Sequence, residues 1–207
     1  MVAGGAKYPV SLEIDYPDRD LDRVTTFFRP LVALPVLVLL ALVSGSATHG
    51  DSNVSFEAGG VLFLATALML VVRQKYPRWW FDWNVALTKF GLRVTTYVAL
   101  LRDEYPSTDE EQAVHVEIPY PDARTELNRW LPLFKWLLAI PHFFVLAVLC
   151  VAAVFAVLGA WVAILFTGRY PRGIFDFVVG VLRWWLRVAA YAVLLTTDEY
   201  PPFRLAS

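Results

Sequence analysis

The feature that most constrains the fold is a run without Asp, Glu, Lys or Arg that extends over residues 136–168. Such a run is long enough to cross the hydrocarbon core of a bilayer, which is about 30 Å thick. The composition agrees, because 57% of the 207 residues are hydrophobic, only 18% are charged and the mean hydropathy is +0.51. Soluble domains are usually less apolar. The sequence therefore predicts a membrane protein.

Two later segments each combine an apolar background with one Asp and two basic residues at positions i, i+7 and i+11. At 3.6 residues per turn, this spacing places the three polar side chains in one narrow stripe along a helix. The stripes are Asp82, Lys89 and Arg93 in the first half, and Asp176, Arg183 and Arg187 in the second. The duplication predicts a first membrane repeat over residues 8–106, a linker over 107–114 and a second membrane repeat over 115–203.

Each repeat is expected to open with a short strand. Residues 8–16 and 115–120 alternate apolar and polar side chains, which is typical of a half-buried strand. We predict a mainly α-helical integral membrane protein with two tandem parallel repeats. Each repeat would contain a short strand, a transmembrane helical hairpin and an amphipathic interfacial helix.

The two expected hairpins differ in how clearly the sequence marks their turn. In the first, a span over residues 31–43, which its flanks extend toward the length of a crossing, and a return run over 60–72 enclose a loop at 46–57 that contains no Lys or Arg. In the second, either one helix of about 50 Å fills residues 136–168 or a tight turn lies near residues 150–153. We favour the turn. Pro35 and Pro141 should kink the helices near their entry sides.

The only cysteine, Cys150, excludes an internal disulfide and is expected to be buried.

Basic residues flank both apolar regions and are absent from the loop at 46–57. The positive-inside rule therefore predicts a multi-pass protein of the bacterial inner membrane with both termini in the cytoplasm. Residues 79–101 and 175–196 could also cross the membrane. We interpret them as interfacial helices, because a third crossing per repeat would place basic linker residues outside.

Several strings in the second half resemble the bacterial membrane family of domain of unknown function 4389. They are Leu-Ala-Ile-Pro-His at residues 138–142, Phe-Thr-Gly-Arg-Tyr-Pro-Arg-Gly at 166–173, Phe-Asp-Phe-Val-Val-Gly-Val-Leu-Arg-Trp at 175–184 and Asp-Glu-Tyr-Pro-Pro-Phe at 198–203. The resemblance covers the second half densely and the first half loosely. It implies tandem repeats in a membrane and no particular activity.

Candidate chemistry is sparse. His142 is the one histidine in a predicted membrane segment, and an intramembrane ionisable residue is a functional hypothesis. Its own run contains no second His, Asp or Glu, which favours a hydrogen-bonded structural histidine. Motifs for catalysis, phosphate binding or metal binding are absent from the sequence, so we expect no enzyme activity, cofactor, metal or nucleic-acid partner.

Two non-enzymatic functions compete. The first is a membrane scaffold or accessory subunit that contacts anionic lipid or a partner protein and forms a homo-oligomer or part of a larger complex. The alternative is a lipid or small-solute transporter or channel built on the internal repeat. The expected contact residues are the two stripes together with Arg169 and Arg172. Basic residues that merely extend toward lipid phosphates would produce the same pattern.

Overall fold

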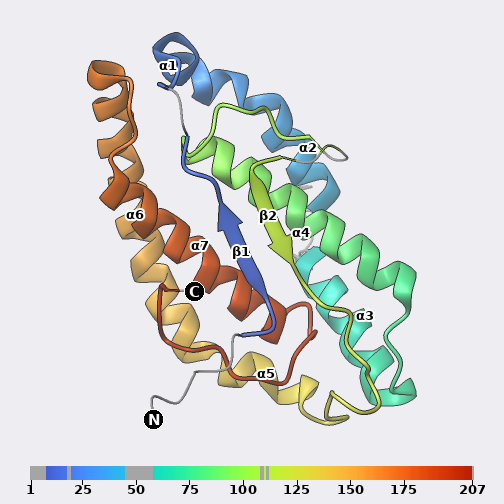
Figure 1. The fold of residues 1–207 in the computed structure, drawn as a ribbon. Coiled ribbons are helices and arrows are strands. Elements are labelled where there is room, and N and C mark those ends of the chain that lie inside the picture. The colour runs from blue at the N-terminus through green and yellow to red at the C-terminus, as the bar shows by residue number, and fades with distance from the viewer. Residues whose placement is uncertain (1–7, 18–19, 45–57, 108–109, 111, 207) are drawn as a thin grey trace, which may run out of the picture.

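The computed structural model describes the chain except residues 1–7, 18–19, 45–57, 108–109, 111 and 207. Helices dominate the described chain, and two strands form a small sheet (Figure 1). The elements in chain order are β1 (Ser11–Ile14), α1 (Arg23–Val32), α2 (Leu34–Ser44), α3 (Ala58–Arg73), α4 (Arg78–Val98), β2 (Val114–Glu117), α5 (Pro132–Leu138), α6 (Ile140–Thr167) and α7 (Arg172–Ala192). The prediction of a mainly helical chain with two short strands is confirmed.

The two strands pair antiparallel, with Leu12 opposite Val116 and Ile14 opposite Val114. These four apolar side chains are buried, whereas the alternating positions Glu13, His115 and Glu117 are exposed. The sheet therefore covers the helices with one face and presents a polar face outward, as the alternation in the sequence predicts.

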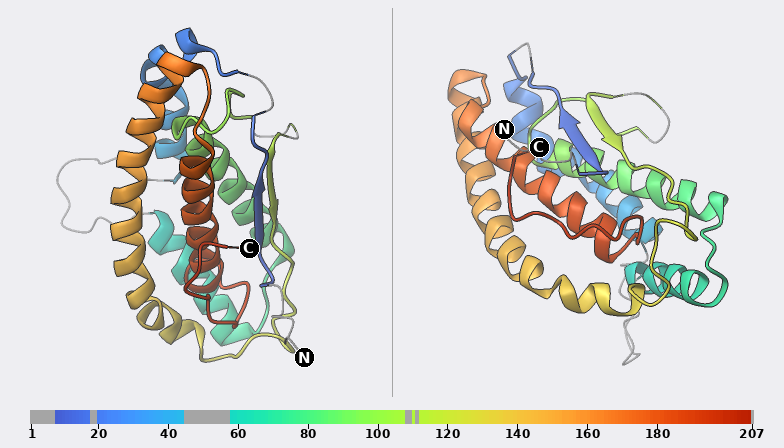
Figure 2. Two further views of the ribbon diagram at one scale, coloured as in Figure 1. Left: turned by 60° about the vertical axis from the view of Figure 1, so that its left-hand side comes forward. Right: turned by 60° about the horizontal axis from the view of Figure 1, so that its bottom comes forward.

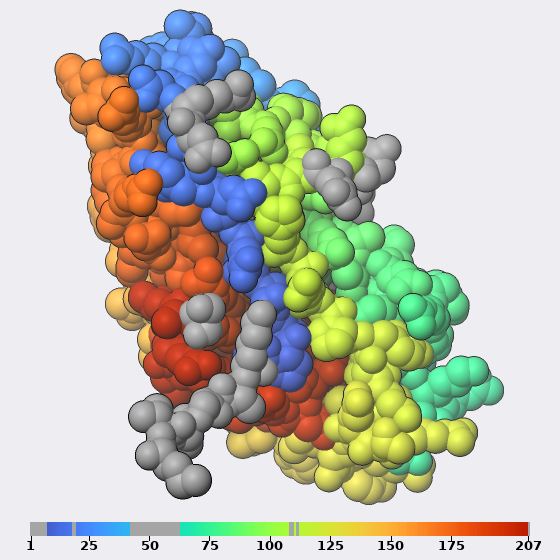
Figure 3. All heavy atoms as spheres, in the orientation of Figure 1, coloured from blue at the N-terminus to red at the C-terminus, as the bar shows by residue number. Residues whose placement is uncertain are grey.

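The molecule is layered. β1 packs against α7 and β2 against α4, while α7 packs on α6 and α4 on α2. In Figure 2 (left), α6 lies on one side, α7 runs beside it in the middle, and the sheet lies on the opposite side. We call α1, α2, α3, α5 and α6 the outer layer. Figure 3 views the opposite side, where the two strands run next to each other down the face.

The predicted turn at residues 150–153 is wrong, because α6 continues through it from Ile140 to Thr167. The sequence there, Cys-Val-Ala-Ala, contains no Gly, Pro or Asn to favour a turn, and alanine is the best helix former. The helix ends instead at Gly168, whose φ of 75° glycine adopts at little cost. The hairpin predicted for residues 136–168 is therefore absent.

Cys150 lies exposed on α6, which corrects the expectation that it is buried.

The chain breaks its helices near the two prolines. Ala33 separates α1 from α2 just before Pro35, and Ala139 separates α5 from α6 just before Pro141. A proline within the first turn of a helix needs no backbone partner for its nitrogen, so α2 and α6 can begin there. The predicted loop at residues 46–57 lies outside the described residues.

Two segments are long and apolar enough to cross a membrane, namely Arg23–Ala41 and Ile140–Thr167. In their most apolar stretches only 22% and 11% of the residues are buried. The core helix of a soluble protein is mostly buried, and these helices are mostly exposed.

Each half of the chain packs against helices of the other half. α1 packs on α6, α5 packs on α3, and each strand lies on the long helix of the other half. The polar contacts match: the Tyr16 hydroxyl donates to the Tyr170 carbonyl at 2.5 Å, and the Tyr120 hydroxyl donates to the Tyr76 carbonyl. Each half therefore holds the turn between the last two helices of the other half.

Candidate functional site

A buried cation lies at the start of the outer layer in the first half. Arg29 of α1 is only 2% exposed and forms an ion pair with Asp103. Its other terminal nitrogen donates to the carbonyl oxygens of Arg102 at 3.0 Å and Tyr97 at 3.3 Å. The guanidinium carbon also lies 4.7 Å from the centroid of the Tyr97 ring. The positive charge thus has a carboxylate, two carbonyls and an aromatic face as partners.

Lys135 of α5 occupies the corresponding place in the second half. Its ammonium lies 2.7 Å from Asp198, 2.7 Å from the carbonyl oxygen of Thr197 and 5.1 Å from the centroid of the Tyr191 ring. Burial lowers the pKa of the Lys135 ammonium, and the hydrogen bond and charge of Asp198 oppose that effect. We call the two arrangements the Arg29 site and the Lys135 site.

The carboxylate of each site also binds a backbone N–H ahead of the helix that carries the cation, at the N-cap of α1 in one site and four residues before α5 in the other. Asp103 accepts from the backbone N–H of Asp22 at 3.2 Å, and Asp198 accepts from that of Asn128 at 2.5 Å. Asp22 and Asn128 in turn accept from the N–H groups two residues later, at 2.8 and 3.0 Å. Each site therefore joins the segment that follows α4 or α7 to the residues that lead into α1 or α5.

Sequence reasoning missed these two sites, although the sequence contains a signal for them. Aligning Ala33 with Ala139 places Arg29 on Lys135, six residues ahead of each proline. The acids belong to the Asp-Glu-Tyr-Pro string that closes each half, at residues 103–106 and 198–201. Nothing in the sequence alone indicates that the basic residue ahead of each proline contacts the Asp of the string that closes the same half.

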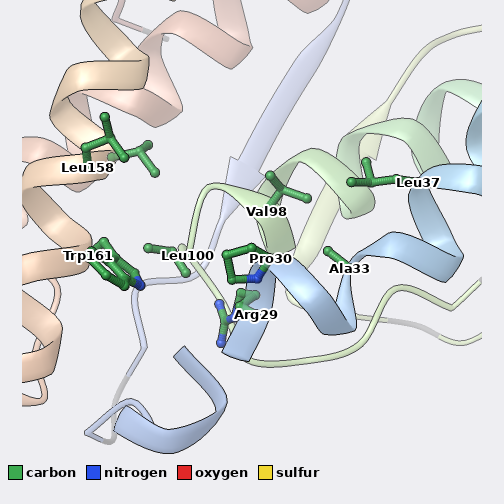
Figure 4. Close-up of a pocket in the computed structure, with 9 residues that line it drawn as sticks. Arg29, Pro30, Ala33, Leu37, Val98, Leu100, Leu158 and Trp161 are labelled. Atoms are coloured by element: carbon green, nitrogen blue, oxygen red, sulfur yellow. The ribbon is translucent and has the colours of Figure 1, made fainter. Parts of the chain in front are cut away.

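A cavity of about 400 Å³ lies beside the Arg29 site, between α1, α2, α6 and the end of α4. Figure 4 shows Pro30, Leu37, Val98 and Leu158 around it, with Trp161 on the α6 side. The indole N–H of Trp161 donates to the carbonyl oxygen of Thr26 at 3.2 Å, which joins α6 to α1. Apart from Arg29, the residues that line the cavity are apolar, so the cavity suits a hydrocarbon chain.

His142 is fully buried near the start of α6, where sequence analysis placed an intramembrane histidine. The indole N–H of Trp184 donates to its Nδ1 at 3.1 Å, and its ring stacks on Phe203 with centroids 3.9 Å apart. A nitrogen that accepts a hydrogen bond carries no proton, so the geometry fits a neutral imidazole. Within the described chain its Nε2 has no hydrogen-bond partner.

The basic residues of the second stripe bind the backbone of their own chain. Arg183 donates to the carbonyl oxygens of Leu12 in β1 at 3.0 Å and Leu205 at 3.4 Å. Arg187 is buried and donates to those of Arg204 at 3.1 Å and Ala206 at 2.6 Å. These contacts hold β1 and the C-terminal segment against α7.

The other predicted contact residues are more accessible. In the first stripe, Arg93 donates to the Ser107 carbonyl oxygen at 2.7 Å, Lys89 is half-buried, and Asp82 is exposed, as is Asp176 in the second stripe. Arg169 is exposed and paired with Asp20 at 2.8 Å.

Arg172 is exposed and lies over the Tyr16 ring at 4.7 Å. Its counterpart Arg78 lies over the Tyr120 ring at 5.0 Å. The predicted site residues therefore do not converge on one site. They are distributed along α4 and α7 and at the exposed turn after α6.

Among the residues that the structure describes, no three His, Cys, Asp or Glu side chains cluster as metal ligands would. No curated protein and no solved structure matches the chain. A family model does match, over residues 130–204, which include the Lys135 site, His142, α6, α7 and the closing Asp-Glu-Tyr-Pro string. The matching model is that of the family described as Domain of unknown function (DUF4389), so the resemblance expected from the sequence is confirmed over these residues.

Proposed function

We propose that the protein is a non-enzymatic membrane scaffold or accessory subunit of the bacterial inner membrane. The observation that carries this proposal is the exposed surface of the outer layer. Along α6 the large apolar side chains Phe144, Val148, Phe155 and Phe166 are each at least 70% exposed. Water would oppose a continuous apolar face of this extent, and lipid or another protein would stabilise it.

The internal organisation supports a scaffold built from two tandem repeats. The Arg29 and Lys135 sites, the two tyrosine contacts and the exchanged helices match between the halves. Buried ion pairs of this kind stabilise little in total but specify one arrangement, which suits a structural role.

Lipid is the contact that the surface chemistry favours. The cavity beside Arg29 opens among exposed apolar side chains of α2 and α6 and suits an acyl chain. Arg169 and Arg172 are exposed where α6 ends, and basic residues at such a position attract anionic headgroups. Termini and linker would lie in the cytoplasm, as the basic residues of the sequence predict.

Membrane fractionation tests the proposal. We expect the protein to stay in the membrane pellet after an alkaline wash and to co-purify with phospholipid in mild detergent. A Phe144→Glu, Phe155→Glu double variant should shift to the soluble or aggregated fraction, because carboxylates on the outer layer are costly in lipid. His115→Gln, a polar change on the exposed sheet face, is the control and should behave like the unaltered protein.

The expected self-association or partner subunit is tested by the mass of the particle in native lipid discs. A monomer free of bound protein and bound lipid would contradict the scaffold proposal.

A further inference from the structure

We propose that the outer layer lies in the plane of one leaflet of an anionic bilayer, with the sheet toward the cytoplasm, so that α6 does not cross the membrane. This inference rests on the proposed membrane function and specifies how the membrane is bound. It takes the place of the crossings predicted from hydropathy.

The first argument concerns the two ends of α6. A continuous helix that crossed the membrane would place its ends on opposite sides. Exposed basic residues flank both ends, with Arg124 and Arg129 before α5 and Arg169 and Arg172 after α6. Basic residues favour the cytoplasmic surface. A helix that lies in the plane allows all four to reach the same anionic surface.

The second argument concerns the sheet. α6, α7 and β1 run beside one another along the molecule, with α7 between the other two (Figure 2). If α6 stood upright, β1 and β2 would lie at the depth of the hydrocarbon core. A two-stranded sheet has two edges with unpaired backbone groups, and lipid-exposed sheet edges do not occur in the hydrocarbon region. The sheet therefore excludes an upright α6.

The third argument is the contrast between the two sides of the molecule. Phe144, Phe155 and Phe166 are exposed on α6, whereas Glu13 and Glu117 are exposed on the far side of the sheet. The stripe residue Arg183, on the intervening helix α7, reaches toward β1 and away from α6. One side is thus apolar along its length and the other side is polar, which is the pattern of a body that lies at an interface.

Depth measurements along α6 test the inference. Phe144, Phe155 and Phe166 are eleven residues apart, so they share one face and follow each other at about 16 Å. Each is changed to Cys in a Cys150→Ala background, labelled with an environment-sensitive fluorophore and reconstituted into vesicles of phosphatidylethanolamine and phosphatidylglycerol. Lipids that carry a quencher near the headgroup or near the chain end report the depth of each label.

We expect the same ratio of shallow to deep quenching at all three positions. If the label at 155 is deeper than the labels at 144 and 166, α6 crosses the bilayer and the inference is overturned, while the proposed membrane function stands. If the labelled protein does not float with the vesicles, the proposed function fails as well.

A second measurement uses the sheet side. Glu13→Cys in the same background should react with a membrane-impermeant maleimide at the rate found in detergent. Strong protection in vesicles would place the sheet inside the bilayer and overturn the inference. Near-ultraviolet circular dichroism of each variant in detergent shows whether it is folded before either result is interpreted.

Discussion

The Arg29 and Lys135 sites occupy matching places in the two halves and reach the same arrangement with different cations. Both cations are buried, paired with an Asp and placed against a tyrosine ring. Arg29 bonds to two carbonyls in addition to Asp103, whereas Lys135 bonds to one in addition to Asp198. The comparison teaches that the position requires a positive charge and that the fork geometry of arginine is secondary.

The requirement for charge comes from the end of the long helix. After α4 and α7 the chain passes through a residue with positive φ, Leu100 at 64° and Leu195 at 58°. The carbonyl oxygens of Tyr97 and Arg102 are then directed at Arg29, and that of Thr197 at Lys135. A helix C-terminus also favours positive charge. The Asp then neutralises the buried charge.

The largest effect is expected from Arg29→Met. The change removes one partner of a buried ion pair and leaves Asp103 and two carbonyls without their donor. We expect the free energy of unfolding to fall by about 3–5 kcal/mol, measured by denaturant titration in detergent micelles. Arg29→Lys is the control and should recover most of the loss, because lysine serves the matching site. An Arg29→Lys variant as unstable as Arg29→Met would show that the two sites are not equivalent.

Lys135→Met should cost less, about 2–3 kcal/mol. Lys135 forms fewer bonds than Arg29, and its partner Asp198 is 22% exposed, compared with 15% for Asp103. The same titration measures the difference. Equal losses at the two sites would mean that the number of hydrogen bonds does not decide how much each cation stabilises the fold. The positive charge alone would then account for both sites.

His142 has no counterpart in the first half, where Val36 is buried at the matching position. We expect His142→Val to lower the free energy of unfolding by about 1–3 kcal/mol, because the Trp184 N–H would lose its buried acceptor. His142→Asn keeps an acceptor and should lose less. If both variants keep their stability but no longer bind lipid or a partner protein, His142 has a role beyond packing.

Arg183 distinguishes a stripe that binds its own chain from one that binds a ligand. Because Arg183 donates to the Leu12 and Leu205 carbonyls, Arg183→Gln should cost about 1 kcal/mol and loosen β1. Arg183→Lys should cost less. Hydrogen exchange of the β1 amides measures the loosening, and co-purified lipid reports binding. Loss of bound lipid without faster exchange would assign Arg183 to recognition.

The smallest effect is a pH dependence shared by the two halves. Burial raises the pKa of Tyr76 and of Tyr170 above the ordinary value of 10.0. A folded pKa above the unfolded one means that the stabilisation is complete below pH 10.0 and is lost as the pH rises further. Thermal denaturation should show a falling midpoint in that range. Tyr76→Phe and Tyr170→Phe should each flatten the fall by a similar amount, and a change confined to one of them would break the equivalence.

The secondary structure was largely predictable because it depends on local patterns. The alternation of Leu12 and Ile14 with polar residues identified β1, and the positions of Pro35 and Pro141 identified the helix breaks. The recurring polar stripe in an apolar background identified α4 and α7, whereas α6 was expected to contain a turn. The string that opens α7 with Arg172 indicated the family model that matches residues 130–204.

Tertiary relations were not predictable from the same patterns. The turn expected near Cys150 followed from the assumption that the second apolar run must fit the thickness of a bilayer, whereas α7 and α1 support one long α6. The Arg29 and Lys135 sites join residues more than sixty positions apart. Their partners depend on how the helices pack.

The exchange of contacts between the halves has a consequence for assembly. A segment that contained only residues 115–203 would present β2 without a pairing strand and α5 without α3 to pack on. A second copy of the same segment would offer its own strand to β2, and its α6 to α5 in the way that α6 packs on α1 in the whole chain. Joining two copies through residues 107–114 converts that encounter into an intramolecular one at an effective concentration on the order of millimolar. With the linker, the two halves can pair at any concentration of the protein in the cell.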